Sequence, residues 1–344
     1  MKKTMEKTMA FAVEKAIFSL RDIRNLVLRE LKMLKLSTLI LALTDKCNLK
    51  CAICDIWEKN ERESKELDFN SLRQILGQEA LKRLKHIYLT GGEPFMRTDL
   101  CEIVLMIKGF YPRSGITISS NGTLTGQILD FLHGTRQFPD IGLEFSLLGA
   151  KTHDVISGVK GSFENLENTI YEVRKMFPSL ILKAKFVITP RNYIAIEEAA
   201  DYCQKRNIPL MFKIVENVES YTNSLNYVKN LRDSSFFINA EQAKSIINTL
   251  NKIKYNPLVN RLSLEYLVDL LDGKSAGKRC FVPFVSLFIN SKGDIYRCRM
   301  REPIGNINET PFNFITAKNQ FIENKAGDNS QACRQCASLL RFLM

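Results

Sequence analysis

The sequence predicts an α/β protein with a parallel sheet, followed by a small C-terminal domain with a β-hairpin. From about residue 38, short apolar runs alternate with amphipathic helical stretches. Such a repeat of strand and helix requires a parallel sheet with helical crossovers. The pattern contains six strands, fewer than the eight that close a TIM barrel. Both an open, partial barrel and a doubly wound sheet agree with it.

The composition is that of a globular protein without a membrane span. The chain has 344 residues, of which 45% are hydrophobic and 25% charged, which excludes disordered and collagenous proteins and allows a large core plus a second domain. No apolar stretch approaches the ~18–20 residues that a spanning helix needs. Charged residues, among them Glu6 and Glu14, interrupt the N-terminus where a secretory signal would be apolar. We therefore expect a cytoplasmic protein.

The charged residues and the cysteines limit the functions that the protein can have. The chain carries 49 Lys+Arg against 37 Asp+Glu, a formal charge of +12, and has 9 cysteines but only 3 histidines. Its basic clusters are short and lack the interleaved aromatic residues of a nucleic-acid stacking surface, which argues against a nucleic-acid partner. Cysteines of a cytoplasmic protein are reduced, so we expect them to serve metal binding or redox chemistry.

The elements are expected in the following order. Residues 1–37 place apolar residues at helical spacing between lysines and arginines, which predicts an amphipathic helical extension that covers the open end of the core or lies on a membrane surface. The six strands are expected at 38–43, 86–90, 115–119, 142–147, 182–188 and 209–215. The helices between them are expected near 68–84, 98–110, 124–136, 162–177 and 194–206.

Two further segments follow this barrel-like region, which ends at about residue 216. A polar stretch and helical patterns near 240–254 and 258–271 predict a helical linker over 217–274. In the remaining segment, 275–344, two apolar runs flank the turn sequence NSKGD at 290–294, which is typical of a β-hairpin. We therefore expect a C-terminal domain built around this hairpin.

Three cysteines follow the first strand at a spacing typical of a metal centre. Cys47, Cys51 and Cys54 form a C-x3-C-x2-C motif on one strand-to-helix loop. A tetrahedral zinc site normally takes four protein ligands, and no histidine lies near this loop. Three thiolates on a [4Fe–4S] cluster would leave one iron open to bind and activate another molecule. We expect the iron–sulfur cluster, with zinc as the alternative.

A second motif, Gly91-Gly92-Glu93-Pro94, ends the second strand. Its glycines would let a ligand reach the backbone, its glutamate offers a carboxylate to an ammonium group, and its proline fixes the loop. Alone, the motif is also compatible with an ordinary strand-end turn. Its position favours a binding site, because ligands of parallel α/β folds lie at the carboxyl ends of the strands, where both motifs are expected.

The two motifs resemble those of the radical S-adenosylmethionine (SAM) superfamily, whose cluster motif matches Cys47, Cys51 and Cys54 and whose methionine-binding motif matches residues 91–94. The resemblance spans about 38–216 and implies a partial (β/α)6 TIM barrel. It also implies that the SAM amino and carboxylate groups bind the open iron of a [4Fe–4S] cluster. An electron from that cluster then cleaves SAM into methionine and a 5′-deoxyadenosyl radical, which abstracts a hydrogen atom from the substrate.

The resemblance suggests further SAM-binding residues. Ser120 and Asn121, in a Ser-Ser-Asn-Gly sequence after the third strand, are similar to a turn that lies near SAM. Ser146 ends the fourth strand where the family often places a serine at the ribose, and Lys183 resembles the basic residue that pairs with the SAM carboxylate in the molybdopterin-precursor cyclase branch. Glu144 lies two residues before Ser146 and points to the same side of its strand. An acidic side chain could therefore meet a polar substrate in the lumen.

The sequence departs from the family at two positions. Ile53 stands where an aromatic residue often precedes the third cysteine, and Ser157 stands where an arginine is common. Adenine can still pack on the aliphatic side chain of Ile53. Any contact that the family's arginine makes with SAM or a helix must come from another residue, and Lys160 is a candidate. His153 is expected to begin a helix rather than to act as a base.

A second set of cysteines lies in the C-terminal segment: Cys280, Cys298, Cys333 and Cys336. The first two bracket the hairpin as C-x12-G-x4-C, with Gly293 at the turn. This arrangement resembles the SPASM/twitch domain over about 275–338 and implies one auxiliary [4Fe–4S] cluster, held by four thiolates and suited to electron transfer. Structural zinc is the alternative for this set. Cys101 and Cys203 are expected to be small apolar residues of helices.

These features together predict a radical SAM oxidoreductase with an auxiliary cluster. The cysteine arrangement is similar to that of twitch-type aminocyclitol dehydrogenase, which favours the oxidation of a small polar molecule. A peptide maturase usually has a leader-recognition domain, for which about 36 residues before the barrel are few, and an epimerase needs a hydrogen donor that the sequence does not single out. A nonenzymatic iron–sulfur or zinc protein would cleave no SAM. The expected reductant is an acidic flavodoxin or ferredoxin, which the positive charge would attract.

Overall fold

The computed structural model describes residues 36–54, 56–61, 66–214, 238–274, 282–298 and 303–308. Of the helical extension expected over residues 1–37, residues 1–35 lie outside these ranges, as do three of the four C-terminal cysteines, Cys280, Cys333 and Cys336. Within these ranges, no helix is both long and apolar enough to cross a membrane.

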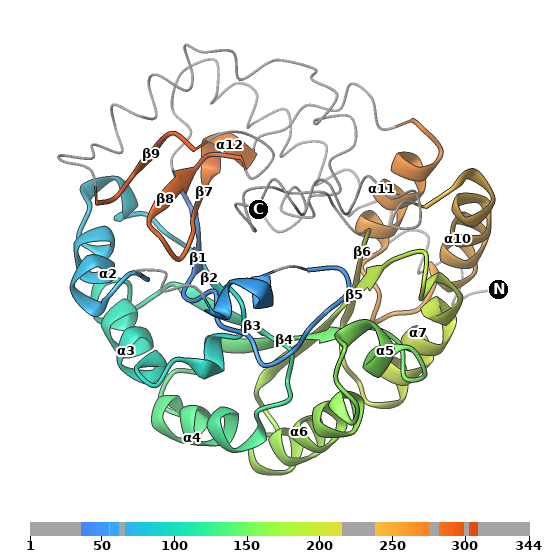
Figure 1. Ribbon diagram of the computed structural model, residues 1–344, viewed down its shortest axis with the longest axis horizontal. Helices are drawn as coiled ribbons and strands as arrows, with labels where there is room; N and C mark the ends of the chain where they lie inside the picture. Colours follow the sequence, from blue (N-terminus) through green and yellow to red (C-terminus); the bar gives the residue numbers. More distant parts are fainter. Residues whose placement is uncertain are drawn as a thin grey trace, which may run out of the picture.

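A single sheet forms the centre of the described chain (Figure 1), with the strand order β6-β5-β4-β3-β2-β1-β7-β8-β9. Its first six strands are β1 (Thr38–Ala42), β2 (His86–Thr90), β3 (Gly115–Ser120), β4 (Ile141–Leu147), β5 (Ile181–Ile188) and β6 (Leu210–Ile214). These strands are neighbours in chain order, and each pairs with the next in parallel. The order never reverses, as it would in a doubly wound sheet. The expected strands are therefore confirmed, and the winding is that of a barrel.

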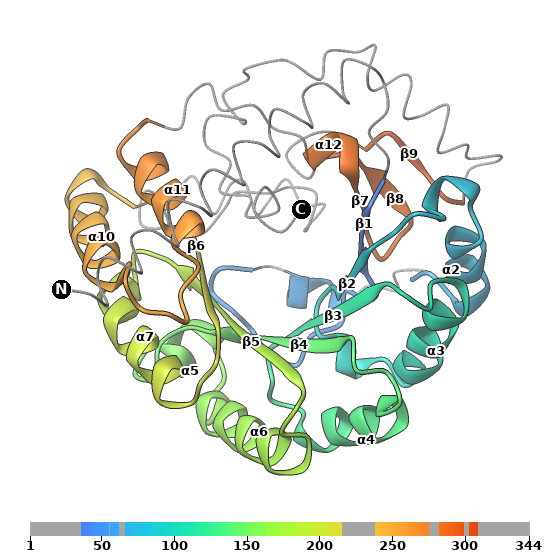
Figure 2. The same ribbon diagram turned by 180° about the vertical axis from the view of Figure 1, so that it is seen from behind.

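Helices cover the outer side of this sheet, and shorter ones lie in the loops that join or precede its strands. They are η1 (Ile56–Glu61), α2 (Phe69–Leu76), η2 (Glu79–Leu81), η3 (Pro94–Met96), α3 (Leu100–Phe110), α4 (Thr125–Thr135), α5 (His153–Ser157), α6 (Ser162–Met176), η4 (Tyr193–Ala195), α7 (Ile196–Lys205), α10 (Ala240–Ile253), α11 (Arg261–Leu271) and α12 (Val282–Val285). Seen from either side, α2, α3, α4, α6 and α7 form an arc around the strands, which α10 and α11 continue (Figures 1 and 2). The two ends of the sheet, β6 and β9, do not pair, so the barrel is open and partial, as expected.

The two faces of the sheet differ in polarity. Along β1, Leu39 and Leu41 belong to the large apolar core between the sheet and the helices. Ile40 and Ala42 point to the opposite, inner face, where they form a separate small cluster with Tyr88 and residues of the hairpin. Because side chains alternate along a strand, the same alternation identifies the residues of the remaining barrel strands that face the lumen.

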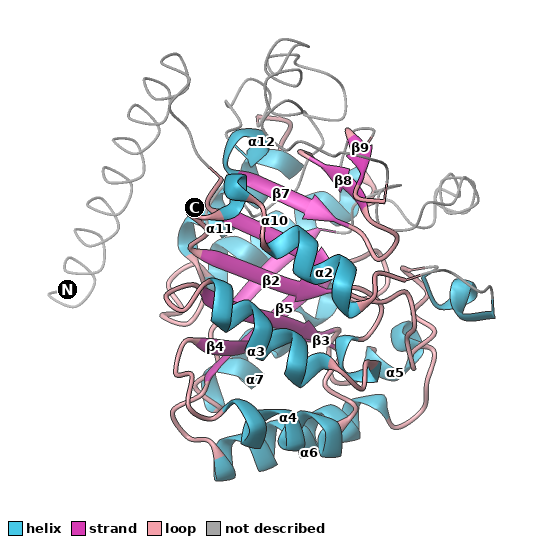
Figure 3. Ribbon diagram, turned by 90° about the vertical axis from the view of Figure 1, so that its left-hand side faces the viewer, coloured by secondary structure: helices cyan, strands magenta, loops and turns pink. Residues whose placement is uncertain are grey.

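The hairpin expected near the C-terminus is present but belongs to the barrel sheet. Strands β7 (Ser286–Ile289) and β8 (Asp294–Tyr296) pair antiparallel, and β9 (Gly305–Asn306) follows β8. β7 also pairs in parallel with β1, and Figure 3 shows it running alongside the barrel strands. All four residues of β7 are buried, which suits a strand covered on both faces. The hairpin therefore occupies the edge of β1 that six barrel strands leave unpaired.

Candidate active site

The three motif cysteines lie on the loop that follows β1, here called the cysteine loop (residues 44–54). Cys47, Cys51 and Cys54 are all half-buried. Burial, and then the charges of Cys54 and Cys47, raise the pKa of the Cys51 thiol to about 12. Burial likewise raises the pKa of Cys47. Cys47 and Cys51 therefore keep their protons at neutral pH until a metal displaces them.

Three thiols on one loop are the donor set that a [4Fe–4S] cluster with one open iron needs. In the described part of the chain, no group of three His, Cys, Asp or Glu side chains is placed to hold a single metal ion. A cubane cluster does not require such a group, since each of its cysteines binds a different iron. Three thiols on one loop would hold three irons of a [4Fe–4S] cluster and leave the fourth open.

The GGEP loop, residues 91–94, packs directly on the cysteine loop. The Gly92 N–H donates to the Thr44 carbonyl oxygen at 2.7 Å. A Cβ on Gly91, whose φ is +138°, would lie 2.3 Å from that same oxygen, and a Cβ on Gly92 would lie 2.1 Å from the Lys46 oxygen. The sequence predicts that these glycines let a ligand reach the backbone. In the structure they are required for the contact between the two loops.

Glu93 joins the GGEP loop to the end of β3. Its Oε1 accepts hydrogen bonds from the Phe95 N–H at 3.2 Å and the Ser120 hydroxyl at 2.9 Å, and its Oε2 accepts one from the Asn121 N–H at 2.8 Å. The residue is 0% exposed. The expectation that its carboxylate meets an ammonium group is therefore corrected, because protein donors already surround a fully buried carboxylate. Burial raises the pKa of Glu93 to about 7 although the hydrogen bonds lower it.

This buried carboxyl predicts a pH dependence of stability that Glu93→Gln removes. The folded pKa of about 7 lies above the ordinary value of 4.5, so the folded state holds the proton more tightly. The stabilisation is complete below about pH 4.5 and is lost as the pH rises through about 7, on the order of 3 kcal/mol in total. Urea unfolding at about pH 5 and about pH 8 measures it.

The matched control for this prediction is Glu79→Gln. The Glu79 side chain is 70% exposed and should leave the pH dependence intact. If Glu93→Gln kept the loss of stability of the unmodified protein, another group would be responsible and the assignment to Glu93 would fail.

Two asparagines link the cysteine loop to the turn after β3. The Asn121 amide donates to the Asn48 side-chain oxygen at 2.8 Å, and the Asn48 amide donates to the Thr123 hydroxyl at 2.8 Å. Asn121 also hydrogen-bonds to the Cys47 sulfur, which lowers the pKa of that thiol against the effect of burial. Ser120 is buried and donates to the carboxylate described above. Of the two residues predicted to bind SAM in this turn, Asn121 thus contacts Cys47, whereas Ser120 contacts the buried Glu93.

The other side of the cysteine loop rests on α5. The Lys50 N–H donates to the Ser157 carbonyl at 2.9 Å, and the Ala52 N–H donates to the Ile156 carbonyl at 2.8 Å. Gly158 has φ +71°, and a Cβ there would lie 2.4 Å from the Lys50 oxygen. Ser157, where the family commonly has an arginine, therefore contacts the cysteine loop through its backbone.

The hairpin also supports the cysteine loop, and the sequence did not predict this contact. The Ser291 hydroxyl donates to an oxygen of buried Asp45 at 2.6 Å, and the Leu67 N–H donates to the Ser291 carbonyl at 2.8 Å. Glu66 accepts hydrogen bonds from the Thr44 hydroxyl at 2.7 Å and from the Asp45 N–H at 3.0 Å. The only local signal was an aspartate two residues before the first cysteine. The turn of the C-terminal hairpin thus holds the start of the cysteine loop.

The lumen below these loops has a charged wall. Lys185 forms an ion pair with Glu144 at 2.7 Å and donates to the Ser119 hydroxyl at 2.9 Å. The lysine charges, Lys185 first, lower the pKa of Glu144 although burial raises it. Ser146 and Lys183 lie on the same inner face, because each is two residues from a lumen-facing neighbour on its strand. The expectation of an acidic residue in the lumen agrees with this position, and Glu144 there is paired with a lysine.

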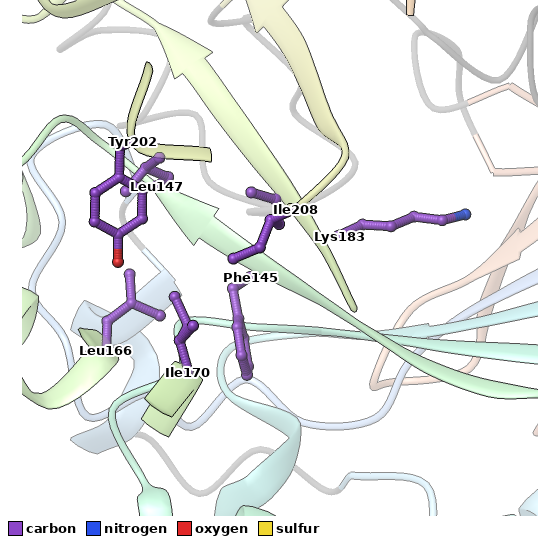
Figure 4. A pocket seen from close by; sticks show the side chains of 8 residues that line it. Phe145, Leu147, Leu166, Ile170, Lys183, Tyr202 and Ile208 are labelled. Atoms are coloured by element: carbon purple, nitrogen blue, oxygen red, sulfur yellow. The ribbon is translucent and has the colours of Figure 1, made fainter. Parts of the chain in front are cut away.

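Lys183 reaches the lumen and not the outer layer. A cavity of about 10 Å³ lies between β4, β5 and the helices α6 and α7, lined mainly by apolar side chains such as Phe145, Leu166 and Tyr202. This volume holds about one water molecule. The Lys183 side chain extends away from the other lining residues (Figure 4). The cavity is thus a packing gap, and the ammonium group of Lys183 belongs to the inner face.

The remaining residues of interest lie outside this centre or at its edge. His153 begins α5 as expected, and burial lowers its pKa to about 4, so it is uncharged at neutral pH. Cys203 is buried in α7 and Cys101 is half-buried in α3. At the hairpin, Gly293 has φ +89° as a turn glycine requires, and Cys298 is half-buried just beyond β8.

Comparisons with known sequences agree with this geometry. A sequence model of the radical SAM superfamily matches residues 41–209, and one of an iron-sulfur cluster-binding domain, SPASM, matches residues 280–337. A probable GTP 3',8-cyclase of Methanococcus maripaludis is 27% identical over 180 residues, which are 51% of this chain and 57% of that protein. The uncharacterized protein MJ0907 of Methanocaldococcus jannaschii is 24% identical over 283 residues, 79% of this chain and 88% of that protein. This chain thus spans little more than half the length of the cyclase.

Solved structures share the fold. Native anSMEcpe with bound AdoMet superposes with a TM-score of 0.63 at 17% identity, covering 89% of this chain and 87% of that chain. Streptococcus suis SuiB bound to precursor peptide SuiA has a TM-score of 0.57 at 17% identity, and the match covers 79% of this chain and 61% of that chain. The two sequence models together include the cysteine loop, the GGEP loop and all four C-terminal cysteines. The chain belongs to the radical SAM superfamily, with a [4Fe–4S] cluster and SAM as cofactors of its barrel and an auxiliary iron–sulfur cluster in its SPASM domain.

Proposed function

We propose that this protein is a radical SAM oxidoreductase that oxidises a small polar molecule in the cytoplasm. The observation that carries the proposal is the position of the three-cysteine loop above a lumen lined by Glu144, Lys185 and Ser119. When bound, the cluster and SAM supply a 5′-deoxyadenosyl radical that removes a hydrogen atom from the substrate. The polar groups of the lumen would bind and orient the hydroxyl groups of such a substrate.

The residues of the barrel divide into those that hold the cofactors and those that support them. We assign Cys47, Cys51 and Cys54 to the cluster. SAM is assigned to the backbone of residues 91–94 together with the side chains of Asn121, Ser146 and Lys183. The structure supports this assignment by placing all of these groups at the carboxyl ends of the strands or on the lumen face. Glu93 and Ser120 would support the site without contacting SAM through their side chains. These buried side chains hydrogen-bond to each other and fix the loops that carry the SAM-binding groups.

The auxiliary cluster favours an oxidation. We assign its ligands to the second cysteine set: Cys280, Cys298, Cys333 and Cys336. Four thiolates saturate a [4Fe–4S] cluster, which suits it to accept an electron from the substrate rather than to bind it. After the hydrogen atom has left, oxidation of the substrate radical releases one electron, which this cluster would receive, and the hydroxyl proton, which would pass to solvent. The formal charge of +12 would attract an acidic flavodoxin or ferredoxin as the reductant.

Anaerobic reconstitution with iron counting and detection of 5′-deoxyadenosine tests the proposal. We expect about eight irons per chain for two cubanes and SAM cleavage that depends on a reductant. About four irons would mean that the C-terminal site holds zinc, and an absence of 5′-deoxyadenosine would refute a radical SAM activity. A subsequent screen then compares polyols and amino sugars with peptides as substrates. It separates dehydrogenation from peptide modification, the alternative that the similarity to SuiB raises.

A further inference from the structure

Arg297 is a buried arginine that directly precedes Cys298, one of the four cysteines assigned to the auxiliary cluster. It follows the last residue of β8 and is 2% exposed. Its Nε and Nη1 atoms are buried and have no hydrogen-bond partner in the described part of the chain. Burial lowers the pKa of Arg297 to about 10, and no charged group of the described ranges contributes to this shift. An arginine guanidinium remains protonated at neutral pH, so a buried positive charge lies beside Cys298 without a counter-charge from the described residues.

Two other cationic side chains that are removed from solvent have such partners. Arg97 donates four hydrogen bonds, two of them to the carboxylate of Asp99. Lys108 is buried and forms an ion pair with Asp140 at 2.5 Å. A buried charge without a partner is costly. The position of Arg297 is therefore best explained by an anionic group that binds beside it.

The course of the hairpin separates Arg297 from the cysteine loop. β7 runs parallel to β1, and β8 returns antiparallel to β7. The turn between these two strands lies at the cysteine loop, where Ser291 donates to Asp45. β8 begins after this turn and ends toward the opposite end of the barrel strands. Arg297 thus belongs to the second cysteine set and not to the three motif cysteines.

The auxiliary cluster is an anion that suits this position. Four thiolates give a [4Fe–4S] cluster a net negative charge, which increases when the cluster accepts an electron, and this net charge is one of the factors that set its potential. Consecutive Cα atoms are about 3.8 Å apart, so the guanidinium is tethered close to a cluster held by Cys298. Charges interact more strongly where water is excluded. A permanent positive charge there stabilises the reduced cluster more than the oxidised one.

We propose that Arg297 is a positioning residue of the auxiliary cluster, whose buried positive charge raises the reduction potential of that cluster. The inference rests on the proposed function, since it takes Cys298 as a ligand of the cluster and the cluster as the electron acceptor. In that reaction the substrate radical loses one electron, the oxidised cluster gains it, and the hydroxyl proton passes to solvent. A higher potential favours this transfer. Arg297 acts on the reaction only through the cluster.

Redox titration monitored by electron paramagnetic resonance tests this proposal. The reconstituted Cys47→Ala protein is used, so that only the auxiliary cluster contributes to the signal. In this background Arg297→Met should lower the midpoint potential by an amount that corresponds to about tenfold or more in the equilibrium constant of reduction, about 59 mV for one electron. Arg297→Lys keeps the charge and should retain most of the potential.

The matched control is Arg136→Met, which removes an exposed arginine at the end of α4. This helix follows β3, which three strands separate from β8, so the midpoint potential should not change. An Arg297→Met protein with an unchanged potential would overturn the proposal, as would equal shifts in Arg297→Met and Arg297→Lys. A C-terminal site that holds zinc, which cannot be reduced, would overturn it too.

Iron counting keeps the test decisive if Arg297→Met fails to load the auxiliary site. A loaded site in Arg297→Lys would then show that the cluster requires the positive charge. Loss of iron in both variants would show that the arginine acts through its shape and would contradict the inference. The proposed function fails separately, because an enzyme with Cys47 intact that produces no 5′-deoxyadenosine refutes it whatever the auxiliary potential is. An unchanged potential in Arg297→Met refutes only this inference.

Discussion

Replacement of Cys47 by alanine is expected to abolish the formation of 5′-deoxyadenosine from SAM and to remove about four of about eight irons per chain. Two remaining thiols on the cysteine loop cannot hold a cubane with a single open iron, so the site that binds SAM is lost. Iron counting after anaerobic reconstitution, together with chromatographic detection of 5′-deoxyadenosine, measures both effects in one sample.

Two other cysteines provide controls for this experiment. Cys101→Ala changes a half-buried thiol of α3 and should leave both the iron content and SAM cleavage unchanged. Cys298→Ala should lower the iron content by about four but should leave the cysteine loop of the barrel intact. If Cys47→Ala still produced 5′-deoxyadenosine from SAM, the assignment of the catalytic cluster would be refuted.

Replacement of Gly92 by alanine is expected to destabilise the fold by about 3 kcal/mol or more and to empty the catalytic cluster site. The added Cβ would lie 2.1 Å from the Lys46 oxygen and 2.6 Å from its carbonyl carbon. Both are backbone atoms, so the cysteine loop itself must move. The movement disrupts the hydrogen bond from Gly92 to Thr44 in addition to the overpacking. Chemical unfolding and iron counting measure the two consequences separately.

Gly109→Ala is the matched control, because a Cβ at Gly109 in α3 meets nothing within 4 Å. An alanine in a helix should be neutral or stabilising by up to about 1 kcal/mol. A Gly92→Ala protein with the normal iron content would show that the two loops tolerate separation, and the proposed role of this glycine would then be wrong.

The fold of the barrel could be predicted from the sequence to within a few residues. Each strand of the repeat has its own apolar run, so β2 was located at 86–90 without any knowledge of its neighbours. The pairing of β7 with β1 could not be found in this way. A buried run such as 286–289 has the same composition whether it pairs with its own hairpin alone or also with a distant strand. The choice between these two pairings depends on the free edge of β1, which the composition of the run does not reveal.

The site was predictable where the chemistry depends on residue type and spacing, and less so where it depends on burial. The three thiols and the strand-end motif were found because few other functions use them. Glu93 was predicted to bind a ligand, because its position in the motif does not reveal that the Ser120 hydroxyl and the Asn121 N–H donate to its oxygens.

The hydrogen bond between Asp45 and Ser291 has a consequence for the biosynthesis of the protein. Its two residues are 246 positions apart, so at ~5–20 residues per second the ribosome needs roughly 10–50 s between them. During that time β1 lacks its β7 partner and the cysteine loop lacks the hydrogen bond from the hairpin. The thiols are thus synthesised well before the site that holds them is complete. The hairpin support of the cysteine loop can therefore form only after residue 291 has been synthesised.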